Sequence, residues 1–211
     1  IKSRMRPYVI VKCFYRHDAP TVVKKRYVYE NVEKKVFEVC HINNRDKITN
    51  SLETEIIDYL QNEVNKYDIV ISSDFGHGLI TENIAKQLQQ MSKFLAVNAQ
   101  TNSANLGYNL ITKKYFDVDF AVVDEPEARL ALQDQHSSIE IVGKELKKRL
   151  NAKQFIITRG KKGSVSFYND ADFIETPSFA LNIIDRVGAG DAFYSIASLC
   201  ASQGISPEIV S

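Results

Sequence analysis

The chain has 211 residues, 44% of them hydrophobic and 25% charged, which is ordinary for a globular protein with one sizeable core. Lys and Arg number 27 against 26 Asp and Glu, so a net charge of +1 offers no general attraction to nucleic acid or anionic membranes. We find no apolar run of membrane-spanning length and no signal peptide, and Cys13, Cys40 and Cys200 are far apart, which indicates reduced thiols in a cytoplasmic protein.

Residues 1–45 are rich in β-forming residues. Polar turn formers interrupt the pattern once, at 30–34. We expect a small antiparallel sheet here, and the pattern fits either a separate lid or the antiparallel edge of a larger sheet. The predicted strands are 7–11, 13–15, 20–29 and 35–40.

In residues 46–211, short apolar runs alternate with amphipathic stretches. The runs predict buried strands, and apolar residues three or four positions apart predict helices. Asn50 or Ser51 is expected to cap the first helix, and Thr81 the second. The alternation predicts β-α-β units and a three-layer α/β domain with a mostly parallel sheet. The strands are expected at 68–72, 94–97, 120–123 and 155–158, a hairpin return at 164–168, and helices at 52–64, 126–132 and 139–150.

The most informative stretch is residues 185–193, which read Asp-Arg-Val-Gly-Ala-Gly-Asp-Ala-Phe. A strand-like stretch at 181–184 precedes it, and a helical apolar pattern follows and ends at Gly204. The layout is a strand, a glycine-rich turn and a helix N-terminus. Such a turn exposes N–H groups that have no partner within the helix, and with the helix dipole they attract phosphate or another oxyanion.

Asp191 directly follows this turn. A carboxylate beside an anion site is placed to take a proton from a hydroxyl group that attacks a phosphate. The structural alternative is an acidic first turn that merely favours the helix dipole. Because Gly188 and Gly190 allow a close approach of the backbone to an anion, we favour the phosphate site.

Residues 185–191 resemble the D-T-x-G-A-G-D signature of the ribokinase-like (PfkB) carbohydrate kinases. That family phosphorylates sugar hydroxyls with ATP and Mg²⁺. The chain departs from the signature at Arg186, where the family has Thr or Ser. Family members are longer, so the resemblance implies that N- and C-terminal parts are missing here; it also makes a monovalent cation a further candidate ligand. The implied roles are catalytic base for Asp191, anion hole for Gly188, Ala189 and Gly190, and nucleotide contact for Asp185.

Two further segments match the nucleotide side of the family's site. Asp124 and Glu127 fall on its N-x-x-E segment, with Asp in place of Asn, and Glu127 would hold Mg²⁺ through water. Thr158 and Gly160 fall on its T-x-G-x-x-G turn, which lies near the nucleotide. If the resemblance is set aside, the structural alternatives are acidic residues that favour the start of a helix for the first segment and a hairpin with a basic tip for the second.

Two other segments resemble the heptose 7-phosphate kinase branch of the family. Residues 20–26 match its P-T-x-x-K-x-R lid segment, and Lys24 and Arg26 share one strand face, from which they could bind a sugar phosphate. Asp74 and His77 fall on S-D-Y-x-K-G, with His in place of Lys. The structural alternatives are a solvated strand face and a turn that Asp74 stabilises.

The predicted function is ATP-dependent phosphorylation of a sugar or sugar phosphate, with heptose 7-phosphate favoured. The resemblance implies a homodimer formed through the β lid. One alternative is another ribokinase-like sugar or nucleoside kinase. The other is a non-catalytic nucleotide-binding relative, which is motivated by the changes at Arg186, Asp124, His77 and Asn98. Asn98 and Gln100 stand where the family has Asp and Lys.

Overall fold

The computed structural model describes residues 4–29, 34–42, 47–101, 105, 107–169, 172–179 and 188–211. The strands are β1 (Val23–Tyr29), β2 (Lys34–His41), β3 (Val70–Asp74), β4 (Leu95–Ala99), β5 (Phe120–Asp124), β6 (Gln154–Thr158), β7 (Ser164–Phe167) and β8 (Phe173–Thr176). The helices are α1 (Asn50–Glu63), α2 (Glu82–Met91), α3 (Ile111–Lys114), α4 (Glu125–Leu132), α5 (Ile139–Leu150), α6 (Ala189–Ser202) and α7 (Pro207–Val210), with 3-10 turns η2 (Val64–Lys66) and η3 (Gly160–Lys162).

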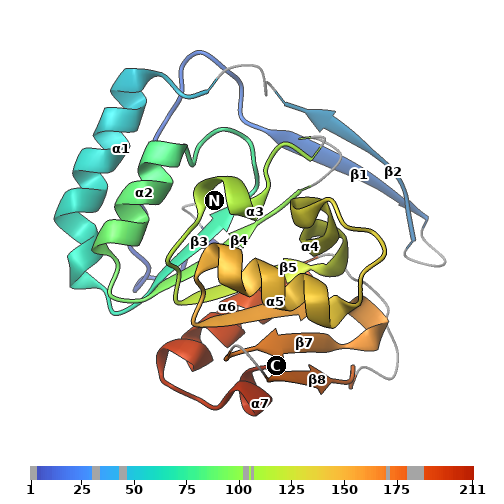
Figure 1. Cartoon of the computed structure of the whole chain (residues 1–211). Helices are drawn as coiled ribbons and strands as arrows, with labels where there is room; N and C mark the ends of the chain where they lie inside the picture. Colours follow the sequence, from blue (N-terminus) through green and yellow to red (C-terminus); the bar gives the residue numbers. More distant parts are fainter. Residues whose placement is uncertain are drawn as a thin grey trace.

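A six-stranded sheet forms the centre of the molecule, in the order β3-β4-β5-β6-β7-β8. The strands β3 to β6 run parallel, and β7 and β8 return antiparallel. In Figure 1, α1, α2, α4 and α5 lie on one side of this sheet and α6 lies behind it. The predicted three-layer α/β fold is therefore confirmed, as is the hairpin return after β6.

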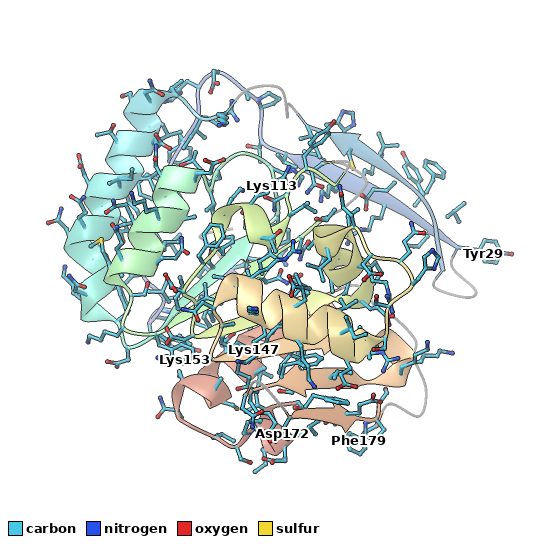
Figure 2. The ribbon with its side chains drawn as sticks, in the orientation of Figure 1. Tyr29, Lys113, Lys147, Lys153, Asp172 and Phe179 are labelled. Carbon is cyan, nitrogen blue, oxygen red and sulfur yellow. The ribbon has the colours of Figure 1, made fainter. Side chains whose placement is uncertain are left out.

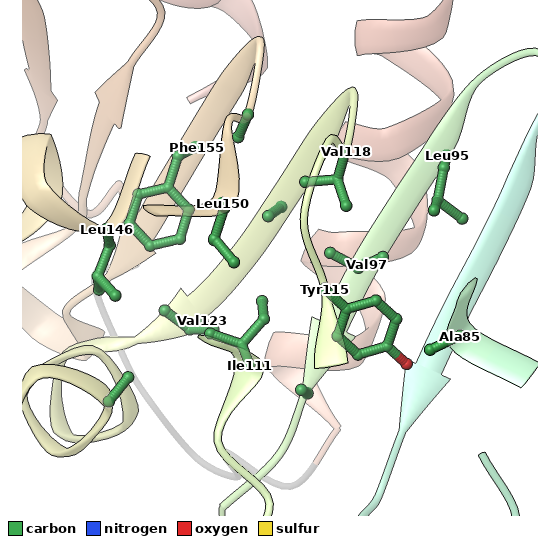
Figure 3. Packing of buried hydrophobic residues seen from close by; sticks show 14 of the residues in the cluster. Ala85, Leu95, Val97, Ile111, Tyr115, Val118, Val123, Leu146, Leu150 and Phe155 are labelled. Carbon is green, nitrogen blue, oxygen red and sulfur yellow. The ribbon is translucent and has the colours of Figure 1, made fainter. Parts of the chain in front are cut away.

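Two hydrophobic cores occupy the two faces of the sheet. Alternate strand residues face opposite ways, so Val97 joins the larger core and Ala96 the smaller one, which α6 and α7 cover. Figure 3 shows the larger core, where Val123 and Phe155 of adjacent strands pack near Leu146 of α5. The apolar runs of the sequence are buried because both faces of the sheet are covered.

Polar caps set the starts of the long helices on the larger core's side. Thr81 caps α2 as predicted, by accepting a hydrogen bond from the Ile84 N–H. The predicted cap of α1 was wrong by one or two positions: Thr49, not Asn50 or Ser51, is extended and accepts from the Leu52 N–H. A cap must reach the amide three positions ahead, which fixes its place.

The buried face of α6 contains polar groups. Tyr194 and Ser198 are buried together with Ala197, whereas Ile196 is 66% exposed. Both buried hydroxyls are satisfied: Tyr194 donates to the Ser72 carbonyl at 3.0 Å, and Ser198 donates to the Tyr194 carbonyl at 2.6 Å. Satisfied polar groups can therefore occupy positions that a hydrophobic pattern assigns to apolar residues.

The N-terminal segment forms fewer strands than predicted. The strands β1 and β2 pair antiparallel, with Arg26 opposite Glu38, and Figure 2 shows Tyr29 pointing outward at the end of β1. The strands predicted at 7–11 and 13–15 are wrong, since these residues are not in a sheet. A strand needs a partner for its backbone groups, and none of the strands in the described ranges pairs with them. The division of the chain near residue 45 stays a prediction.

Among the described residues, no helix combines the length and apolarity that crossing a membrane requires. The cysteines Cys13, Cys40 and Cys200 are free thiols, as their spacing predicts.

Candidate active site

The carboxyl ends of the parallel strands meet at one edge of the sheet. The pairing registers place Asp74 level with the end of β4, and Asp124 opposite Thr158. Ligands in open α/β sheets bind at this edge. The start of α6 reaches the same edge, because Gln100, which directly follows β4, hydrogen-bonds to Asp191. Residues that the sequence spreads over more than half the chain are thus brought together.

The start of α6 leaves backbone amides open. Its N-cap, Gly188, has a left-handed φ of 82° and no side chain to cap the helix. The first helical hydrogen bond runs from the Ala192 N–H to the Gly188 carbonyl at 2.9 Å, so the amides of residues 189–191 have no partner within the helix. A Cβ atom added to Gly190 would meet nothing within 4 Å, so the space there is open. This arrangement fits an oxyanion.

A group of carboxylates lies beside these amides. Asp124 and Glu127 form a capping box at the start of α4, in which each side chain accepts from the other's N–H, at 2.8 and 3.0 Å. The second oxygen of Glu127 accepts from the Thr101 N–H at 2.9 Å. Burial, together with the nearby charges of Asp124 and Asp191, raises the pKa of Glu127 to about 7. A bound cation would relieve this repulsion.

The group suits a Mg²⁺ ion that is shared with a nucleotide. Across the described ranges, no three His, Cys, Asp or Glu side chains converge into a ready-made metal site. Mg²⁺ does not need one, because it keeps several waters and is commonly held by one or two carboxylates plus phosphate oxygens. Glu127 and Asp124 would supply that carboxylate contact. Asp185 and Arg186 lie outside the described residues, so the nucleotide contact of Asp185 and a monovalent cation near it stay predictions.

A cavity of about 1750 Å³ opens beside the start of α6. Its lining includes five predicted nucleotide or anion-hole residues, together with Phe179, which Figure 2 shows beyond the end of β8. Those five residues are Asp124, Thr158, Gly160, Ala189 and Gly190. The cavity joins the α6 amides to the β5 and β6 strand ends, which is the space that a nucleotide would need.

The loop after β3 is held by a largely buried ion pair. The Asp74 carboxylate accepts from Lys114 Nζ at 2.7 Å and from the Gly76 N–H at 2.9 Å. Lys114 also donates to the Ile80 carbonyl at 2.9 Å, which fastens the end of the same loop. Asp74 is therefore engaged in holding the loop. Figure 3 shows the nearby Tyr115 hydroxyl directed toward β3, where it contacts the Ser72 hydroxyl at 3.2 Å.

His77, in this loop, is affected by the charge of a residue on the small β1–β2 sheet. Both ring nitrogens are enclosed and have no hydrogen-bond partner among the described residues. Burial lowers the pKa of His77, and the charge of Lys24 on β1 lowers it further against the opposing effect of Asp74. Arg26, on the same face of β1, is paired with Glu38 at 2.7 Å. The β1–β2 sheet and the loop after β3 thus bring Lys24 and His77 to the same region.

The sequence pattern assigns no role to several side chains that join the ends of β3 and β4 to the start of α6 and to α3. Gln100 could have been suspected because it directly follows a buried strand. Lys114, Asn105 and Asn109 belong to a short helix and a loop without periodicity, and no signal marked them.

Similar proteins were found by sequence and by structure. The bifunctional protein HldE of Desulfatibacillum aliphaticivorans is 25% identical over 167 residues, covering 77% of this chain and 33% of that protein. The protein of the same name from Campylobacter jejuni subsp. doylei is 24% identical over 171 residues, covering 80% of this chain and 36% of that protein. The chain thus spans about a third of the length of these relatives.

Solved structures show the same fold at low identity. Phosphofructokinase-2 from Escherichia coli in complex with potassium matches with a TM-score of 0.65 and 11% identity, over 82% of this chain and 56% of that one. Arabidopsis thaliana ribokinase complexed with ribose and ATP matches with a TM-score of 0.58 and 18% identity, over 82% of this chain and 55% of that one. Residues 17–205 match the family model described as pfkB family carbohydrate kinase, and the chain therefore belongs to that family.

Proposed function

We propose that this chain is the phosphoryl-transfer part of an ATP-dependent carbohydrate kinase. The observation that carries the proposal is the open set of amides at the start of α6 with the exposed Asp191 carboxylate directly beside it. The amides suit the transferring phosphoryl group, and the carboxylate suits the hydroxyl that attacks it. ATP would occupy the adjoining cavity. The protein would act in the cytoplasm, where ATP is available.

In the proposed step, the acceptor oxygen attacks the γ-phosphorus of ATP and the bond to the β–γ bridging oxygen breaks. Asp191 takes the proton of the acceptor hydroxyl. The N–H groups of residues 189–191 stabilise the negative charge that spreads over the phosphoryl oxygens. Mg²⁺, held through water by Glu127 and Asp124, would neutralise part of the phosphate charge.

The preferred acceptor is a sugar phosphate, with heptose 7-phosphate as the specific candidate. Lys24 and the enclosed, unpartnered nitrogens of His77 support a phosphate contact on the acceptor side. The likeness to proteins named HldE and the lid segment of residues 20–26 support the same choice. Asp74 would act through the loop that it holds. Arg26 would have to exchange its Glu38 partner for the substrate.

That engagement of Arg26 and Asp74 favours a second candidate, a kinase for an unphosphorylated sugar or a nucleoside. Because Arg26 and Asp74 are paired inside the protein, only Lys24 and His77 of the four predicted substrate residues would bind an acceptor phosphate. An acceptor without a phosphate would not need the other two. Release of ADP in the presence of heptose 7-phosphate, fructose 6-phosphate, ribose and adenosine separates the candidates. A heptose kinase should respond to the first compound alone.

The substitution Asp191→Asn tests the chemistry. We expect turnover to fall by about 10²- to 10⁴-fold, because the amide cannot take the proton. The affinity for MgATP, measured by calorimetry, should stay near that of the wild type. The control is Asp68→Asn. The Asp68 side chain is 92% exposed and is not one of the predicted site residues. Full turnover by Asp191→Asn would contradict the catalytic role, and binding of MgATP without any turnover by the wild type would support a non-catalytic relative.

A further inference from the structure

One hydrogen bond joins the end of β4 to the first turn of α6. Gln100 Nε2 donates to Asp191 Oδ1 at 2.9 Å, across 91 positions of sequence. Within the described part of the chain, no other residue donates to this carboxylate. Asp191 itself is exposed on the surface of the helix start. Its side chain would otherwise be free to change rotamer, because an exposed carboxylate keeps most of its rotational freedom.

The main-chain N–H and carbonyl of Gln100 both make hydrogen bonds that fix its position. Its N–H donates to the Asp74 carbonyl at 2.8 Å. Its carbonyl accepts from Asn105 Nδ2 at 2.9 Å and from Asn109 Nδ2 at 3.2 Å. Both asparagines are buried, with 7% and 4% of their surface exposed. Buried amides whose hydrogen bonds are made hold a loop in one position.

The neighbouring loop is shaped to let these asparagines reach Gln100. Gly76 has a φ of +71°, and an added Cβ would lie 2.6 Å from the Cβ of Asn109. No other residue type fits this contact without displacement of the asparagine. Asn109 also donates to the Asp74 carbonyl at 3.1 Å, so the ends of β3 and β4 are tied together by the same side chain.

A neutral donor suits the carboxylate of a general base. The amide engages Oδ1 and leaves Oδ2 able to face an acceptor hydroxyl. Fixing the reacting group before the substrate binds lowers the entropic part of the barrier.

We propose that Gln100 is a positioning residue, which holds Asp191 in the orientation needed for proton transfer. This inference rests on the function proposed above. Gln100 need not touch the substrate. It acts through Asp191, and Asn105 and Asn109 hold it in turn.

The kinetic test is Gln100→Leu, with Gln100→Met as a second variant of closer shape. We expect kcat to fall by up to about 10²-fold, the loss typical of a misplaced catalytic group, while KM for ATP and for the sugar stay unchanged. In an Asp191→Asn background, Gln100→Leu should cause no further loss, because the group that it positions is gone. The matched control, Gln90→Leu on the exposed side of α2, should leave kcat unchanged.

Two kinetic results would overturn the proposal. Losses that multiply in the double variant would mean that Gln100 acts independently of Asp191. A raised KM for the sugar with an unchanged kcat would make Gln100 a binding residue instead. Melting temperatures of both single variants that match the wild type exclude unfolding as the cause.

A measurement without turnover separates this proposal from the proposed function. The side-chain amide resonance of Gln100 in ¹⁵N-labelled protein should move toward free-amide values in Asp191→Ala. An unmoved resonance would disprove the contact even in an active enzyme. Absence of ADP release with every acceptor would instead disprove the kinase function, and the amide resonance would still decide whether Gln100 holds Asp191.

Discussion

At the scale of single residues, the site contains carboxylates in different surroundings. Asp191 is exposed and accepts one hydrogen bond from a neutral amide. Glu127 is partly buried and lies beside two other acids, which together with its burial raise its pKa to about 7. Near neutral pH, therefore, Glu127 keeps a proton in part of the free protein. A cation at the site would displace that proton.

The raised pKa of Glu127 predicts a pH-dependent stability. Between the ordinary value of 4.5 and about 7, the folded protein keeps a proton that the unfolded chain releases. The free energy of unfolding therefore falls as the pH rises through this window, by at most a few kcal/mol. The variant Glu127→Gln stays neutral, so its melting temperature should fall less between pH 5 and pH 7.5 than that of the wild type.

The measurement is a thermal melt of both proteins at each pH. Added Mg²⁺ at pH 7.5 should recover part of the wild-type loss, since the ion stabilises the ionised carboxylate. Parallel pH profiles of the wild type and Glu127→Gln would contradict the assignment.

At the scale of elements, the ends of β3 and β4 form one connected unit with α3. The buried ion pair of Asp74 and Lys114 joins β3 to α3, and the Asp74 carbonyl accepts from the main chain of Gln100. The loop that carries His77 is fastened between them. An acceptor bound near His77 would therefore meet a loop that is already ordered.

We expect a large loss of stability when the ion pair of Asp74 and Lys114 is broken. Lys114→Met leaves the Asp74 charge buried without its partner, which costs about 3–5 kcal/mol in unfolding free energy. The double variant Lys114→Met/Asp74→Asn should recover much of this loss, because the unpaired charge is gone. Urea denaturation measures both. The control is Lys113→Met, because Lys113 is the exposed neighbour of Lys114 on α3 and is labelled in Figure 2. Equal losses for the two lysines would contradict a structural role for the pair.

The elements themselves were largely predictable, because their residues are periodic and buried together. The strands from β3 to β6 and the helices α1, α2, α4 and α5 follow apolar patterns, and α6 follows the G-A-G-D turn. The family could be predicted from that turn alone, and the anion-binding role of its amides stays a prediction. Residues 7–15 were misjudged because β-rich composition does not supply a partner strand. Gln100, Lys114 and Asn109 were missed because their contacts join distant positions, which local patterns do not encode.

At the scale of the whole molecule, the sheet of β1 and β2, which we propose as the lid, has two chemically different faces. Alternation along β1 and β2 puts Lys24 and Arg26 on one face, which the charge of Lys24 shows to lie near His77. The opposite face carries Tyr27 and Phe37, whose rings stack with centroids 4.3 Å apart. Both rings are exposed, at 39% and 51%. We propose that this aromatic face forms the contact of a homodimer.

A charge on that face should separate the subunits. Phe37→Glu removes apolar contact area and places a carboxylate in the interface, so the wild type should be a dimer and the variant a monomer by light scattering. Tyr67→Glu is the control, since Tyr67 is similarly exposed, at 47%, but lies outside the lid. A wild-type monomer, or a variant that remains dimeric, would contradict the lid interface.

The groups that we propose to bind an anion at the start of α6 belong to the main chain, and this has an evolutionary consequence. Replacement of a side chain leaves a peptide N–H in place, provided that the turn keeps its shape. Positions around the site can therefore diverge, as Asn98, Gln100 and Arg186 have done relative to the family pattern, while the attraction for phosphate persists. The residue on which that persistence depends most is Gly188, since its left-handed conformation is strained for any side chain.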